Sequence, residues 1–235
     1  MTDTNGKDAA DQAVADLERE LGLPKGFFNG LVHEDDWSFV IKLHALFESA
    51  LAFVVAHKLG EKVAGIIGRL DMNGQRGKVA FARALEIVGD DEVRFLALLS
   101  SLRNRCVHGV RQTVEFSLPG YVEALSRDER KSFLRAVRGD EPDRRITIGD
   151  KTVSHTQFVL ENPKLSIWLS SMWLLAALYM LKEIEDHVRR RERALIELAT
   201  LKTPPAPNPL LIALSGKAGD SGGLMGFAAP DGDKG

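Results

Sequence analysis

The chain has a single cysteine, Cys106, among its 235 residues. A lone cysteine cannot form an internal disulfide, which favours a reducing compartment, so we expect the protein to be cytoplasmic. The six histidines are scattered at spacings that do not match a metal site. We therefore expect no metal and no cofactor.

The chain also lacks a strong excess of positive or negative charge. The 31 Lys and Arg residues and 33 Asp and Glu residues leave a formal net charge of −2. This balance excludes a protein that coats nucleic acid by bulk electrostatics, so any contact with RNA must come from a local basic cluster. The first eleven residues are polar and acidic, and this predicts no secretion signal.

Long apolar runs are limited to residues 165–181, which hold no charged side chain. This stretch lies at the lower edge of the roughly 20 residues that a membrane-spanning helix needs. It continues into Lys182 and Glu183 without a turn signal, which favours one long helix with a buried first half. We expect a core or dimer-interface helix here rather than a membrane span. A membrane-associated protein is the third hypothesis.

Helical spacing of apolar residues dominates the rest of the chain and predicts an all-α protein, an antiparallel helical bundle. We expect an N-terminal arm over 1–33, a helical domain over 34–200 and a disordered tail over 201–235, where prolines give way to glycine. The expected helices cover 8–22, 35–59, 61–70, 77–88, 91–108, 121–138 and 162–200.

The sequence pattern changes over residues 110–160, where strand-like alternation appears beside helical spacing. This predicts a small α/β-hairpin insertion. Residues 114–118 alternate as a strand would. Ser126 and Glu129 have the spacing of a capping box within a helix over 121–138. Residues 145–148 and 152–153 flank Gly149 and predict a hairpin.

The candidate catalytic residues lie at the C-terminal end of the helix expected over 91–108. At about 100° per residue, Asn104 and His108 share one side of this helix, and Arg103 lies at its margin. The opposite side is an apolar stripe that should face the core, made of Phe95, Leu99, Leu102 and Cys106. A second surface must therefore close over Asn104 and His108 if they are buried, and a symmetric copy of the same helix is the economical candidate.

These residue types suit metal-free cleavage of RNA. Histidine titrates near neutral pH and can transfer protons, and a guanidinium such as that of Arg103 matches phosphate geometry with paired hydrogen bonds. Asn104 could orient the imidazole of His108 or hold a phosphate oxygen. The same three residues are also typical of a capped, solvated helix end, so the residues alone leave that alternative open.

Arg103, Asn104 and His108 resemble the signature of the HEPN superfamily. That signature lies near the end of a core helix. It is an arginine, then a polar residue that is often asparagine, and a histidine a few residues later. The stretch 73–89 ahead of the motif helix is similar to HEPN proteins too, including the mannitol-operon-repressor-like branch. The resemblance covers 34–109 well and 162–200 loosely.

Membership would imply a homodimer that pairs two motif helices. It would also imply a metal-independent endoribonuclease that cleaves RNA by 2′-hydroxyl attack, as a toxin or defence effector with an antitoxin or regulatory partner. Arg103 and His108 would be catalytic together with Asn104. Apart from the resemblance, Glu48 and Arg105 are candidates for supporting roles. The alternative is a non-catalytic HEPN dimer that binds RNA or a regulatory protein. One toxin branch has a tyrosine two residues after the histidine, where this chain has Val110.

His44 and Glu48 lie one turn apart on the helix over 35–59. A partly buried ion pair or an ordinary polar face is our interpretation, and a second layer of contacts behind the motif residues is the alternative. Trp168 and Trp173 are interpreted as packing or interface anchors.

Overall fold

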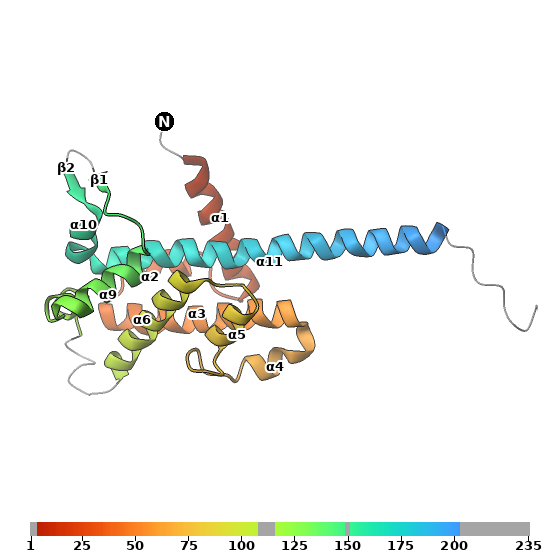
Figure 1. Cartoon of the computed structure of the whole chain (residues 1–235), viewed down its shortest axis with the longest axis horizontal. Coiled ribbons are helices and arrows are strands. Elements are labelled where there is room, and N and C mark those ends of the chain that lie inside the picture. The colour runs from red at the N-terminus through yellow and green to blue at the C-terminus, as the bar shows by residue number, and fades with distance from the viewer. Residues whose placement is uncertain (1–3, 108–115, 149–150, 203–235) are drawn as a thin grey trace, which may run out of the picture. The chain divides into compact units, whose positions relative to one another are not determined.

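The computed structural model describes residues 4–107, 116–148 and 151–202. This part of the chain is mostly helical and contains one two-stranded hairpin, which confirms the predicted fold class (Figure 1). The chain divides into two compact units, residues 1–188 and 189–235. In the described part of the second unit, residues 189–202 are helical.

The elements of the structure are, in chain order, α1 (Thr4–Glu20), α2 (Phe27–Leu31), α3 (Asp36–Leu59), a 3-10 turn (Glu61–Val63), α4 (Ala64–Ile67), α5 (Lys78–Ala84), α6 (Asp90–Val107), α8 (Leu118–Glu123), α9 (Arg127–Arg138), β1 (Arg145–Ile148), β2 (Lys151–Ser154), α10 (His155–Glu161) and α11 (Pro163–Lys202).

Helix α3 is central to the first unit because the other helices cover it on several sides. Asp35 caps its N-terminus by accepting a hydrogen bond from the Ser38 amide at 2.9 Å, as expected of an acidic residue at a helix start. The buried positions fill more than one face of the helix. They are Phe39, Val40, Leu43, Leu46, Phe47, Ala50, Leu51, Val54, Val55 and Ala56.

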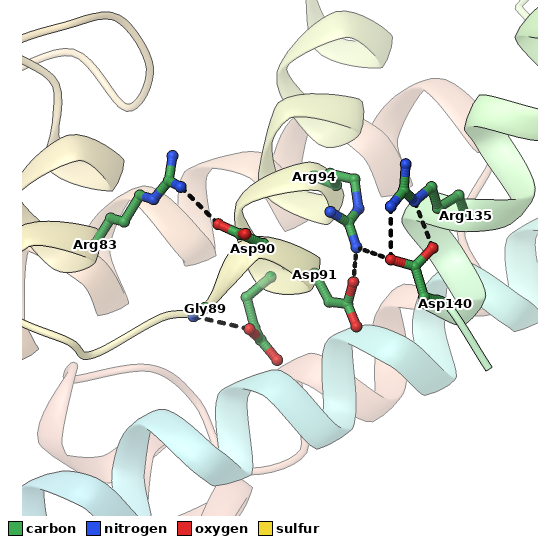
Figure 2. A network of polar contacts seen from close by, with 8 residues as sticks. Arg83, Gly89, Asp90, Asp91, Arg94, Arg135 and Asp140 are labelled. Carbon is green, nitrogen blue, oxygen red and sulfur yellow. Dashed lines mark hydrogen bonds and ion pairs between the residues drawn. The ribbon is translucent and has the colours of Figure 1, made fainter.

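An exposed ion-pair network ties the first turn of α6 to the end of α9 (Figure 2). Arg94 pairs with Asp91 on its own helix and, at 2.9 Å, with Asp140. Arg135 of α9 reaches the same Asp140 carboxylate at 2.7 Å. These two guanidinium groups lower the pKa of Asp140 to about 2, first through the hydrogen bond from Arg135. The network thus links the start of α6 to the segment that follows α9.

The insertion differs from the prediction in its first half. Leu118, expected to end a strand, is the first residue of α8, and Ser117 caps that helix by accepting from the Gly120 amide at 3.3 Å. Pro119 lies in the first turn, where a missing N–H costs nothing. Residues 114 and 115 of the expected strand lie outside the described residues.

The single helix expected over 121–138 is two helices, α8 and α9. Ser126 separates them because its hydroxyl caps α9, and Glu129 completes the predicted capping box. The predicted hairpin is confirmed as β1 and β2, which pair antiparallel with Ile146 opposite Val153. Helix α10, which was not predicted, follows the hairpin directly.

The stretch between the helices expected over 8–22 and 35–59 contains the short helix α2, which a buried carboxylate contacts. Glu18 is only 4% exposed, and its two oxygens accept from the Gly26 amide at 2.8 Å and the Phe28 amide at 2.7 Å. Amides at the start of a helix have no partner within the helix. Glu18 of α1 supplies those partners and so joins the predicted arm to the core.

Replacing Glu18 with alanine is expected to lower the free energy of unfolding by about 2 kcal/mol, because two amides near α2 lose their acceptor and a buried space opens. Urea denaturation followed by circular dichroism measures the change. Asn29→Ala, at an exposed position of α2, is the matched control and should change stability by less than about 0.5 kcal/mol. Equal effects of the two substitutions would contradict this role for Glu18.

Candidate functional site

The last turns of α6 present the motif residues on the outside of the fold. Arg103, Asn104 and Arg105 are exposed, and Arg103 Nη1 donates a hydrogen bond to Asn104 Oδ1 at 3.2 Å. His108 lies outside the described residues. The opposite side of the helix is buried, as its spacing predicted, and consists of Phe95, Leu99, Leu102 and Cys106.

The end of α6 is fastened to α3 by a tryptophan. Trp37 Nε1 donates to the carbonyl oxygen of Cys106 at 3.1 Å, and this satisfies one of the carbonyls that a helix C-terminus leaves unpaired. Burial, assisted by the negative charge of Asp36, raises the pKa of the Cys106 thiol to about 11. The thiol is therefore protonated at neutral pH and has a packing role.

Arg105 turns toward the insertion. Its guanidinium lies over the ring of Tyr121 with the central carbon 4.9 Å from the ring centroid, which is a cation–π geometry. Tyr121 in turn packs edge-on against Phe133, with centroids 6.2 Å apart. This contact attaches α8 and α9 to the end of α6, so Arg105 has a structural contact beside the motif whatever its further role.

A histidine of α3 faces the same side of α6 as the motif. His44 Nε2 lies 3.2 Å from Ser100 Oγ. Ser100 precedes Arg103 by three residues and Asn104 by four, so these three side chains share one face of α6. His44 is partly exposed, whereas Ser100 is 8% exposed. The structure thus places an imidazole from α3 next to the face that carries Arg103.

The electrostatic surroundings of His44 lower its pKa. Burial of the imidazole is the largest cause. The carboxylate of Glu48 opposes the shift, and the positive charges of Arg103 and Lys78 add to it. The lowered pKa favours the neutral imidazole, and the charges around it come from three helices: α3, α5 and α6.

Glu48 pairs with a buried lysine. Lys78 is 2% exposed, and its Nζ donates to Glu48 Oε1 at 2.9 Å and also to the Leu70 carbonyl. Gly77 permits the tight turn before Lys78, since a Cβ at Gly77 would lie 2.5 Å from the backbone oxygen of Asn73. Of the two supporting residues predicted, Glu48 is thus joined to the motif face through His44, with which it interacts electrostatically.

Sequence reasoning missed His44 facing Ser100 and the burial of Lys78. A signal for Lys78 was present, because Lys78, Ala82 and Leu85 have the spacing of one helix face, and a charge on an apolar face indicates a buried ion pair. The partner of His44 had no such signal, since Ser100 lies 56 residues away. Only the packing of α3 against α6 reveals it.

A groove of about 860 Å³ lies elsewhere, between the first half of α6 and helices α9, α10 and α11. Asp91 and Phe95 line it, together with Arg138, His155 and Trp173 among others. Arg103 follows Asp91 by 12 residues, which is about 18 Å along a helix. Arg103 and Asn104 are not among the residues that line the groove, so the groove is separate from the described part of the candidate site.

Two further features bear on function. Within the described residues, no three His, Cys, Asp or Glu side chains gather in a way that could hold a metal ion. By length and composition alone, α3 and α11 could each cross a membrane, but 56% and 44% of their most apolar stretches are buried inside the fold. One or two such helices are weak evidence for a membrane span, because core helices pass the same test.

Comparison with protein-family models, with curated proteins and with solved structures found no match. The residues at the end of α6 and their neighbours on α3 and α5 are therefore the features from which we infer a function.

Proposed function

We propose that the protein is a HEPN-type, metal-independent endoribonuclease that cleaves RNA by attack of the ribose 2′-hydroxyl. One observation carries the proposal: Arg103 and Asn104 are exposed and hydrogen-bonded to each other in the last turns of α6, five and four residues before His108 in the sequence. The helix end that holds them is fixed by Trp37 and by the Arg105–Tyr121 contact.

In the proposed reaction the 2′-oxygen loses its proton and bonds to phosphorus, and the bond from phosphorus to the 5′-oxygen breaks. Arg103 binds the nonbridging phosphate oxygens and stabilises the negative charge that accumulates on them. His108 transfers a proton at neutral pH, and Asn104 holds a phosphate oxygen or the imidazole. The products are a 2′,3′-cyclic phosphate and a 5′-hydroxyl.

The proposed active form is a homodimer in which two α6 ends meet over one RNA strand. The exposure of Arg103 and Asn104 supports this, because the described part of a single chain leaves both open to solvent and a symmetric copy can close over them. A lone buried cysteine fits a cytoplasmic setting. There the protein would act as a toxin or defence effector, with an antitoxin or regulatory protein as its partner.

The test is cleavage of a mixed RNA pool by the full-length protein in EDTA, with His108→Ala as the control. We expect the wild-type protein to cleave and the variant not to. Wild-type protein that cleaves no better than His108→Ala would refute the nuclease proposal. Protein that binds RNA without cleaving it would instead favour a non-catalytic HEPN dimer.

A further inference from the structure

The contact between His44 and Ser100 joins the candidate site to a second histidine. His44 Nε2 lies 3.2 Å from Ser100 Oγ, and Ser100 lies one helical turn before Arg103 on the same face of α6. Ser100 is buried, with 8% of its surface exposed, so its hydroxyl can hold the imidazole in one orientation. His44 itself keeps some solvent exposure, as a group that exchanges protons with a ligand needs.

The charges that act on His44 come from three helices. Glu48 is one turn further along α3, Lys78 comes from α5, and Arg103 comes from α6. Glu48 is already paired with Lys78 at 2.9 Å. Arg103 is the charged neighbour of His44 that belongs to the candidate site. Burial and the two cations together keep the pKa of His44 below that of a free histidine.

We propose that His44 is a catalytic residue of this site, the base that takes the proton from the ribose 2′-hydroxyl. This inference rests on the proposed function. When Nε2–H is donated to Ser100 Oγ, the lone pair on Nδ1 accepts the proton while the 2′-oxygen bonds to phosphorus. His108 then gives a proton to the departing 5′-oxygen. The two proton transfers are thereby assigned to two imidazoles, and Arg103 binds the phosphate.

The electrostatic part of the inference can be tested without any catalysis. NMR titration of the full chain should give a pKa for His44 below the usual 6.5. Arg103→Gln should raise it, because a nearby positive charge is removed. Glu48→Gln should lower it, because the one opposing charge is lost, while the glutamine can still accept from Lys78. If the pKa of His44 fails to rise in Arg103→Gln, or fails to fall in Glu48→Gln, the electrostatic interaction on which the assignment depends is overturned.

The catalytic part is tested by cleavage kinetics with His44→Gln, because glutamine can keep a hydrogen bond to Ser100 but cannot take up a proton. We expect kcat/KM to fall about 10²- to 10⁴-fold. His33→Gln, at an exposed position before α3, should leave it unchanged. In wild-type protein, the acidic limb of the pH profile of kcat/KM should follow the His44 titration. Glu48→Gln should move that limb to lower pH.

The outcomes separate the two claims. If His44→Gln cleaves RNA as fast as the wild-type protein, with the same acidic limb in its pH profile, the role of His44 is overturned. The nuclease proposal would still stand. Wild-type protein that does not cleave at all would overturn both. A loss of activity in His44→Gln with the NMR shifts in the expected directions would support the assignment.

Discussion

Replacing Arg103 with alanine is expected to lower kcat/KM for RNA cleavage about 10²- to 10³-fold, the usual effect of removing one preorganised donor to a developing negative charge. Arg103 is exposed, and its contact within the described chain is the hydrogen bond to Asn104. The loss should therefore come from the reaction and leave the thermal unfolding temperature nearly unchanged. Initial rates at substrate concentrations well below KM measure the effect.

Arg103→Lys distinguishes charge from geometry. Lysine keeps the positive charge but cannot give two parallel hydrogen bonds to one phosphate, so we expect it to restore RNA binding but only part of the cleavage rate. Arg83→Ala is the matched control, because Arg83 is also exposed and pairs with Asp90 at the other end of α6 at 2.7 Å. An equal loss in Arg83→Ala, or full activity in Arg103→Ala, would contradict the role given to Arg103.

The second large effect is expected on stability, from Phe47→Ala. Phe47 of α3 is completely buried, and its ring meets that of Phe95 of α6 edge-on, with centroids 6.0 Å apart. Removing a buried phenyl group leaves a cavity and costs about 3–5 kcal/mol. We therefore expect the free energy of unfolding to fall by this amount in urea denaturation.

Ile66→Ala is the control for this substitution, because Ile66 is 65% exposed and should change the free energy of unfolding by less than about 0.5 kcal/mol. The Phe47–Phe95 contact joins the two helices that bring His44 to Ser100. Phe47→Ala should thus also weaken the coupling between His44 and Arg103 in an NMR titration. A loss of stability below about 1 kcal/mol would contradict tight packing at this joint.

Helices with strong local signals could be predicted from the sequence. The start of α3 at Asp36 was predicted within one residue, and the Ser126–Glu129 capping box was predicted as a local motif, although it begins α9 and does not lie inside one longer helix. The hairpin followed from alternation on both sides of Gly149. In each case, residues close in sequence determine the structure, so a single chain carries enough information.

The errors fall where a distant partner decides the structure. The stretch between the first two expected helices contains α2, and Glu18 on the preceding helix accepts from its Phe28 amide and from the Gly26 amide just before it. Leu118 begins a helix partly because Asp36, 82 residues earlier, accepts from its amide at 2.8 Å. Alternation over five residues cannot outweigh such contacts, and no local pattern announces them.

The site was predictable to the same extent. Helical spacing correctly placed Cys106 in the core and predicted the side of α6 that faces away from it. It could not predict that α3 would bring His44 to Ser100, or that Lys78 of α5 would pair with Glu48. These contacts depend on the packing of three helices, which the sequence specifies only through the fold as a whole.

Cleavage at a single 2′-deoxy position tests the central claim most directly. An RNA oligonucleotide whose cleavage site has been mapped is compared, in EDTA, with the same oligonucleotide carrying one 2′-deoxy nucleotide at that site. If the 2′-oxygen is the nucleophile, the deoxy position is left intact, and the all-RNA products end in a 2′,3′-cyclic phosphate and a 5′-hydroxyl. Cleavage at the deoxy position, or products with a 5′-phosphate, would contradict the mechanism.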